Sequence, residues 1–131
     1  MTTFNLAVGN TDAHAKNISI LRPRRGRAVL APAYDVAMHG HHGDAALARF
    51  AMRVNGKDDM ATLTANDLVD EAMSWTMPRK RAVRAVVSTL EGLEIALREI
   101  PRDDHGGVRP AAWAVVEENT ARLARQARAL A

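Results

Sequence analysis

The sequence has no cysteine, only 4% aromatic residues and no long apolar run. Without cysteine the chain cannot form disulfides, and a reducing compartment is permitted. No apolar stretch approaches the ~18 residues that a membrane helix needs. The first residues also lack the basic and apolar regions of a signal peptide. We therefore expect a cytoplasmic protein with no membrane partner.

The composition favours one helical domain. A chain of 131 residues is long enough for a real core. A hydrophobic fraction of 47% with few aromatics favours packing of Ala-, Val- and Leu-rich helices over a β-sandwich. The formal net charge of +3 weakly favours acidic partners. No two-helix DNA-reading unit is recognisable, so we do not expect direct nucleic-acid binding.

Polar residues gather in two short stretches. Residues 9–17 read Gly-Asn-Thr-Asp-Ala-His-Ala-Lys-Asn, and residues 32–35 read Pro-Ala-Tyr-Asp. Clusters of Asp, Asn, Thr and Gly often only form turns, because their short side chains bond the local backbone. These particular residue types also match the needs of phosphoryl transfer.

Phosphoryl transfer needs a carboxylate that orients the attacking hydroxyl, oxygen ligands for Mg²⁺ and a cation near the phosphate. Asp12 suits the first role and Lys16 the last. Asn17 and Asp35 offer the hard oxygen donors that Mg²⁺ prefers. The Asp-x-x-x-x-Asn spacing is that of the protein-kinase catalytic loop, which a later metal-binding Asp completes.

The longer pattern resembles the HipA-type toxin kinases, which are bacterial serine/threonine kinases. Asn-x-Asp-x-His-x-Lys-Asn followed by Leu-x-Pro-x-Tyr-Asp carries this resemblance, which continues through residues 53–57 and 63–68. It implies Asp12 and Lys16 as catalytic residues, with Lys16 beside the γ-phosphate of ATP. It also implies Asn17 and Asp35 as Mg²⁺ ligands.

Three further positions gain roles from the resemblance. Asn10 and His14 match positions that brace the loop, and Tyr34 joins Lys16 as a residue that binds the nucleotide. The family often has a threonine shortly after the Tyr-Asp pair. Here residues 36–39 read Val-Ala-Met-His, so the geometry just after Asp35 departs from the pattern.

The resemblance implies a mainly α fold. We expect a protein-kinase-like C-terminal lobe over residues 1–131, in which a small β-hairpin carries the catalytic and metal-binding loops. Only eight residues precede Gly9, and no glycine-rich phosphate loop occurs elsewhere. The N-terminal lobe is therefore expected to be absent, and the isolated chain to have little or no kinase activity.

The family also implies partners. These are a protein substrate, best known as an aminoacyl-tRNA synthetase, and a HipB-like helix-turn-helix antitoxin of a toxin–antitoxin system. A separate N-lobe chain or a homodimer would be a further partner. The alternative function is a non-catalytic helical interaction module or a degraded kinase remnant. Mg²⁺-dependent nucleotide binding would separate the two.

Local patterns predict the elements. A helix is expected over residues 2–8, and strands at 17–21 and 28–31 flank an arginine-rich turn. A short helix leading to an extended piece is expected over 45–54, with a turn at Asn55-Gly56. Capping, apolar spacing and proline positions predict three later helices, which begin near residues 64, 78 and 110.

A histidine cluster and an arginine cluster each allow a structural and a functional interpretation. The histidines at positions 39, 41 and 42, with Asp44, could bind Zn²⁺ or Ni²⁺. Their tight spacing without distant ligands favours a simple loop. The arginines at positions 22, 24, 25 and 27 could meet phosphates, but a solvated hairpin turn is the favoured interpretation.

Overall fold

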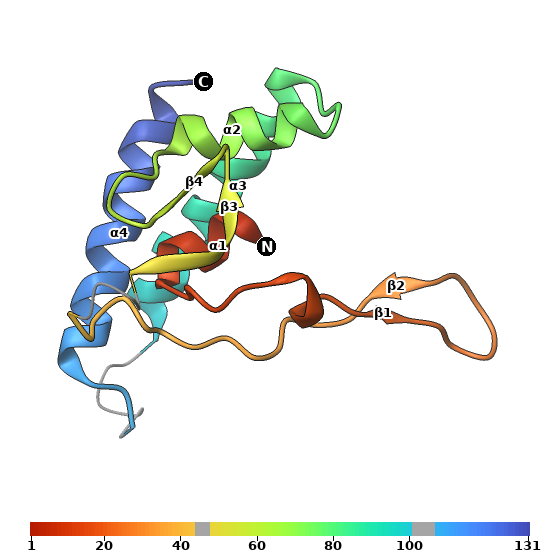
Figure 1. The fold of residues 1–131 in the computed structure, drawn as a ribbon, viewed down its shortest axis with the longest axis horizontal. Helices are drawn as coiled ribbons and strands as arrows, with labels where there is room; N and C mark the ends of the chain where they lie inside the picture. The colour runs from red at the N-terminus through yellow and green to blue at the C-terminus, as the bar shows by residue number, and fades with distance from the viewer. Residues whose placement is uncertain (44–47, 101–106) are drawn as a thin grey trace.

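The computed structural model describes residues 1–43, 48–100 and 107–131. Its elements are α1 (Thr2–Val8), η1 (Ala15–Asn17), β1 (Ile20–Leu21), β2 (Val29–Leu30), β3 (Arg49–Val54), β4 (Lys57–Asp59), α2 (Ala65–Ser74), α3 (Arg79–Glu99) and α4 (Pro110–Arg128). The four α-helices form a packed body, and the hairpin of β1 and β2 projects from it as an arm (Figure 1). None of the described helices is both long and apolar enough to cross a membrane.

The core lies where the helices meet. Helix α3 packs against α1, α2 and α4, and α4 also packs against α1 and α2. Leu6, Leu63, Leu90 and Leu123 are fully buried there. Burial of each such side chain contributes about 1.5–3 kcal/mol relative to exposure. The predicted mainly helical architecture is therefore confirmed.

The last helix buries the stripe that its sequence predicts. Pro110 occupies its first turn, where a missing N–H costs nothing. Val116, Thr120, Leu123 and Ala127 are buried along one face. The three- and four-residue spacing thus places α4 against the other helices, which agrees with its predicted role in the core.

Strands β3 and β4 form a second hairpin, which the sequence interpretation missed. The predicted turn at Asn55 and Gly56 is present, and both residues have positive φ angles of 49° and 77°. Such a turn suits the twist of a two-residue β-hairpin. A short helix leading to an extended piece was expected over 45–54; the extended piece is confirmed by β3, and residues 49–54 contain no helix. Residues 44–47 lie outside the described residues.

Two apolar side chains of β3 anchor the strand in the core. Phe50 and Val54 are buried in the core, whereas Ala51, Met52 and Arg53 between them are exposed. Strict alternation would place Met52 on the same face as Phe50 and Val54, but the pairing of β3 with β4 is irregular between Arg49 and Val54, and Met52 is exposed. Local helix propensity is overruled here by this tertiary burial.

The arm is apolar on both faces. Ile20 pairs with Leu30, and Leu21 pairs with Val29 in an antiparallel register. Successive side chains of a strand point to opposite faces, so each face of the ribbon carries one apolar pair. All four side chains are exposed, by 50–68%. The hairpin is predicted correctly, although its ladder is shorter than the expected strands.

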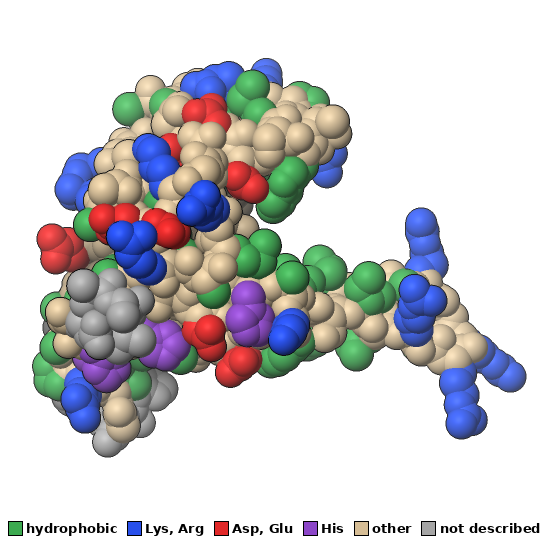
Figure 2. Space-filling view, viewed as in Figure 1, with side chains coloured by type: hydrophobic (Ala, Val, Ile, Leu, Met, Phe, Trp, Pro, Cys, Tyr) green, Lys and Arg blue, Asp and Glu red, His purple; other side chains and the backbone are tan. Residues whose placement is uncertain are grey.

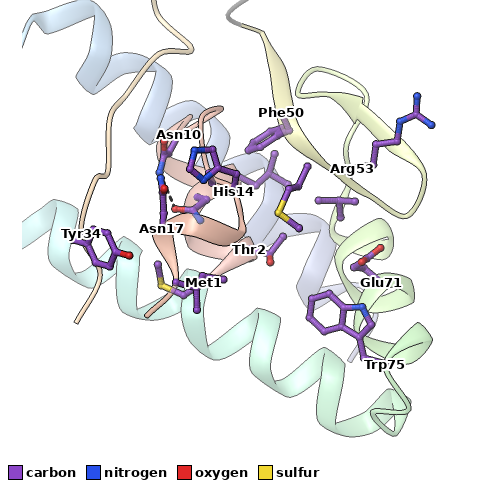
Figure 3. A pocket seen from close by; sticks show the side chains of 16 residues that line it. Met1, Thr2, Asn10, His14, Asn17, Tyr34, Phe50, Arg53, Glu71 and Trp75 are labelled. Atoms are coloured by element: carbon purple, nitrogen blue, oxygen red, sulfur yellow. Dashed lines mark hydrogen bonds between the residues drawn. The ribbon is translucent and has the colours of Figure 1, made fainter. Parts of the chain in front are cut away.

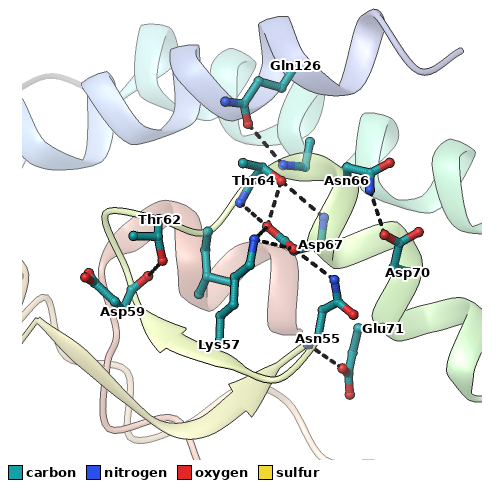
Figure 4. A network of polar contacts seen from close by, with 12 residues as sticks. Asn55, Lys57, Asp59, Thr62, Thr64, Asn66, Asp67, Asp70, Glu71 and Gln126 are labelled. Atoms are coloured by element: carbon teal, nitrogen blue, oxygen red, sulfur yellow. Dashed lines mark hydrogen bonds and ion pairs between the residues drawn. The ribbon is translucent and has the colours of Figure 1, made fainter.

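A buried carboxylate ties α2 to the second hairpin. Asp67 is only 3% exposed and completes the predicted capping box with Thr64. Its oxygens accept hydrogen bonds from the Thr64 N–H and hydroxyl at 2.9 and 2.7 Å. They also bind Asn55 Nδ2 and Lys57 Nζ, at 2.9 and 3.0 Å (Figure 4).

These contacts change the acidity of Asp67. Burial raises the pKa of the carboxyl, but the hydrogen bonds from Lys57, Asn55 and Thr64 outweigh burial and lower the pKa from 3.8 to about 2. The charged form is therefore favoured in the folded state. One unit of pKa corresponds to about 1.4 kcal/mol, so the charge of Asp67 contributes about 2 kcal/mol to folding near neutral pH.

We expect Asp67→Asn to lower the free energy of unfolding by about 2 kcal/mol at pH 7. Because the folded pKa lies below the unfolded one, the contribution of Asp67 is complete above about pH 4 and disappears as the pH falls toward 2. Urea titrations between pH 2.5 and 7 measure the difference between variant and wild type. Glu91→Gln, at an exposed site on α3, is the control. A difference that stays constant across this range contradicts the proposed linkage.

Candidate functional site

The first polar stretch begins with a buried turn at the end of α1. Gly9 caps the helix with a φ of 71°, a left-handed conformation that glycine adopts without cost. The Gly9 carbonyl accepts hydrogen bonds from the N–H groups of His39 and Gly40. The Thr11 carbonyl accepts one from Ala51 of β3 at 2.8 Å. Asp12 is the first exposed residue after this anchored turn.

Asn10 and His14 lie inside the loop. Asn10 is 2% exposed, and its Nδ2 donates to Asn5 Oδ1 of α1 at 3.2 Å. That contact is of the kind that holds a loop on a helix. Asn10 Oδ1 and His14 Nδ1 are buried and have no hydrogen-bond partner among the described residues. A bracing role for His14 therefore stays a prediction.

The side chain of Asn17 turns back toward Asp12. Its Nδ2 donates to the Asp12 carbonyl at 3.4 Å, a long hydrogen bond that crosses the η1 turn. This orientation directs the amide nitrogen to the backbone and leaves the amide oxygen available as a ligand. Lys16, within the same turn, is exposed.

Tyr34 joins the second polar stretch to the first. Its hydroxyl donates to the Lys16 carbonyl at 2.8 Å and lies 2.7 Å from Ser19 Oγ. The return strand is also paired here, since Ala31 N–H donates to the Ser19 carbonyl at 2.8 Å. Because the hydroxyl is occupied, the ring face is what Tyr34 can offer a ligand.

Asp35 follows in an unusual backbone conformation. Its φ is 56°, a left-handed value that is uncommon outside glycine, although Asp and Asn tolerate it best. Asp35 and Asp12 are both exposed and are the only acidic residues before position 44. Figure 2 shows two acidic side chains at the base of the arm, near a histidine and a basic side chain.

The donor set suits Mg²⁺ chemically. Asp12, Asn17 and Asp35 offer carboxylate and amide oxygens, the hard ligands that this ion prefers. The hydrogen bonds of Asn17 and Tyr34 bring the segments that carry these residues together. The assignment of individual ligands and of catalytic roles to Asp12 and Lys16 stays a prediction.

A cleft separates the arm from the helical body. Tyr34 and Asn17 lie on its arm side, and Trp75 and Glu71 of α2 lie opposite (Figure 3). Its volume is about 110 Å³, below the roughly 300–1,000 Å³ of typical small-molecule sites. The cleft as it stands is therefore too small to enclose a nucleotide.

Sequence reasoning missed the body side of this cleft. Trp75, which is 63% exposed, follows α2 and has no motif around it. Phe50, Met52 and Arg53 come from β3, the strand that was not expected to begin at residue 49. A large aromatic side chain just past an amphipathic helix was the available signal for Trp75.

The histidine segment resembles a loop more than a metal centre. His41 Nδ1 lies 2.7 Å from the Met38 carbonyl, and its ring is 4.0 Å from that of His42. Within the described ranges, no group of three His, Cys, Asp or Glu side chains could hold a metal ion. Asp44 lies outside these ranges. The arginines of the arm tip are exposed.

Comparisons with known proteins agree with the motif. The family model described as HipA-like C-terminal domain matches residues 1–96. Y4mE of Sinorhizobium fredii, a protein whose kinase activity is itself inferred, is 32% identical over 100 residues, covering 73% of this chain and 23% of that protein. The solved HipA structure from Shewanella oneidensis, in a complex of HipA, HipB and operator DNA, has a similar fold. Its TM-score is 0.63 at 21% identity, covering 98% of this chain and 29% of that one.

We expect Tyr34→Phe to loosen the base of the arm, because the variant loses the hydroxyl contacts to Lys16 and Ser19. Hydrogen exchange at the Ala31 amide should accelerate about two- to tenfold, which corresponds to roughly 0.5–1.5 kcal/mol. Ser19→Ala, which removes one of the two contacts, should have a smaller effect. Unchanged exchange in both variants would mean that these contacts do not order the arm.

Proposed function

Since the chain belongs to the HipA-like C-terminal domain family, we propose that it supplies the catalytic loop and metal-binding residues of a serine/threonine protein kinase. Mg²⁺ and ATP are the proposed cofactors. The chain spans 23% and 29% of the lengths of the two proteins compared. Transfer is therefore proposed to require groups that residues 1–131 do not contain, namely a phosphate-covering loop and a strand lysine.

The observation that carries this proposal is the contact between the two polar stretches. Tyr34 binds the Lys16 carbonyl, and Asn17 binds the Asp12 carbonyl. Residues that are far apart in the sequence thereby meet at the base of the arm. The left-handed backbone at Asp35 adds support, because such conformations concentrate at functional sites.

In the proposed site each residue has one task. Asp12 accepts a hydrogen bond from the attacking hydroxyl of a substrate Ser or Thr and so orients it. The Lys16 ammonium offsets negative charge on the transferring phosphate. Asn17 and Asp35 would hold Mg²⁺, which neutralises charge on the phosphate oxygens when bound. The ring of Tyr34 would flank the nucleotide.

We propose that the fold is a kinase-like C-terminal lobe, which its similarity to the solved HipA structure supports. Helices α1 to α4 form the body, and the buried turn at Gly9 presents the catalytic loop. The solved HipA comes from a complex with HipB and DNA. By resemblance we propose a helix-turn-helix antitoxin as a partner and a toxin–antitoxin system as the setting, with a protein as substrate.

A paramagnetic probe tests the metal site directly. Mn²⁺ accepts the same oxygen ligands as Mg²⁺, so it should broaden amide NMR signals around Asp12, Asn17 and Asp35. We expect Asp35→Asn to weaken this binding about tenfold or more, equal to about 1.4 kcal/mol. Asparagine tolerates the left-handed backbone as aspartate does, so the variant removes charge without adding strain.

Glu99→Gln, on the exposed end of α3, should leave Mn²⁺ binding unchanged. Broadening that spreads evenly over all acidic surfaces, or that survives Asp35→Asn undiminished, would rule out the proposed metal site.

Activity tests the need for further groups. With radiolabelled ATP and Mg²⁺, the 131-residue chain alone should transfer no more phosphate to a protein acceptor than its Asp12→Asn variant does. The reason is that nothing in the chain would cover the nucleotide phosphates. Robust transfer by the chain that disappears in Asp12→Asn would show that the chain suffices, which contradicts this expectation.

A further inference from the structure

The tip of the arm is densely basic. Residues 22–28 join β1 to β2 and read Arg-Pro-Arg-Arg-Gly-Arg-Ala. All four of these arginines are exposed. Figure 2 shows basic side chains spread around the far end of the arm, above it, below it and beyond it. The turn therefore presents several guanidinium groups to the surrounding solvent.

No acidic group balances these arginines. Residues 13–34 hold five of the 18 lysines and arginines and none of the 15 aspartates and glutamates. The other 109 residues therefore carry a formal net charge of −2, although the whole chain carries +3. Within the described ranges, none of the four arginines forms an ion pair. The excess positive charge of the chain is thus confined to the arm.

The backbone of the turn keeps these charges close together. The ring of Pro23 restricts its φ angle. Gly26 has a φ of 109°, a value that residues with a side chain rarely adopt. The pairing of Leu21 with Val29 closes the segment. Guanidinium groups that repel one another are therefore gathered in one short turn, and a bound anion would relieve that repulsion.

The surroundings of the arginines favour a short acidic segment of a protein over a nucleic acid. A guanidinium group fits carboxylates and phosphates alike, so its surroundings decide between them. A nucleic acid is bound by cations that follow its backbone along a surface, whereas these arginines surround a turn. Residues 18–33 also contain no aromatic side chain on which a base could stack.

The charge of the rest of the chain points the same way. Because the other residues are net negative, they would repel a long polyanion that extended beyond the tip. A segment short enough to stay at the tip avoids most of this repulsion, since salt screens charges over short distances.

The arm connects its tip to the proposed catalytic loop. Strand β1 begins three residues after Asn17, and β2 ends five residues before Asp35. Both strands therefore run between the tip and the proposed metal ligands. A protein held at the tip would be tethered near Asp12, which raises the effective concentration of its Ser and Thr hydroxyls there.

We propose that the arginines of residues 22–27 form a docking site for an acidic segment of the protein substrate, separate from the residue that is phosphorylated. The guanidinium groups bind the Asp and Glu carboxylates of that segment. The role of this site in substrate capture rests on the proposed kinase function, whereas the binding of acidic segments can be measured independently of it.

A short peptide of alternating Glu and Gly residues tests the site on the full 131-residue chain. In NMR titrations it should shift the amide signals of residues 22–28, and added salt should weaken its binding. The double variant Arg24→Gln/Arg25→Gln should bind the peptide about tenfold more weakly, because each exposed charge pair contributes a modest free energy.

Arg81→Gln/Arg84→Gln is the matched control, since it removes the same charge from two exposed arginines of α3. This variant should bind the peptide as the wild type does. Three results would overturn the docking site: no binding at low salt, an equal loss in the α3 variant, or tighter binding of duplex DNA or single-stranded RNA than of the peptide through Arg24 and Arg25.

The Mn²⁺ titration separates this proposal from the proposed function, because Arg24→Gln/Arg25→Gln should leave Mn²⁺ binding intact. Peptide docking in a chain without a localised Mn²⁺ site would count against the kinase function and leave the acidic-segment site standing. A localised Mn²⁺ site in a chain that does not bind the peptide would refute the docking site alone.

Discussion

The structure depends on one anchored turn, at which the chain leaves the helical core and enters the polar loop. Gly9, Asn10 and Thr11 are buried between α1, the segment around Gly40 and strand β3. The carbonyls of Gly9 and Thr11 accept hydrogen bonds from two distant parts of the chain. A buried carbonyl without a partner is costly, so these hydrogen bonds hold the turn in place. Asp12 emerges from it with a defined position.

The buried carboxylate of Asp67 supports that turn indirectly, through the second hairpin. Its carboxylate binds Asn55 and Lys57 in the second hairpin. Strand β3 of this hairpin then donates from Ala51 to the Thr11 carbonyl. A continuous set of contacts thus runs from the start of α2 to the loop that carries Asp12. The chain therefore combines a loop that hydrogen bonds hold in place with an arm whose apolar side chains are exposed.

The arm and the body differ in whether their apolar residues are buried. The body buries its apolar residues where α3 and α4 pack against each other and against the other helices. The arm does not, since within the described part of the chain its two short strands form a sheet of their own without a third strand. Apolar residues at 20, 21, 29 and 30 are therefore left exposed on the arm.

The sequence by itself determined the elements whose signals are local. The capping box of Thr64 and Asp67 begins α2 where the structure has it, and the predicted turn at Asn55 and Gly56 is present. Each depends on residues within a few positions of one another. The tertiary structure alone decided that β3 pairs with β4 in a second hairpin, that Trp75 faces the arm across a cleft, and that Tyr34 reaches Lys16. Those features depend on which distant segments bury one another, and burial is a property of the packed chain that no local pattern encodes.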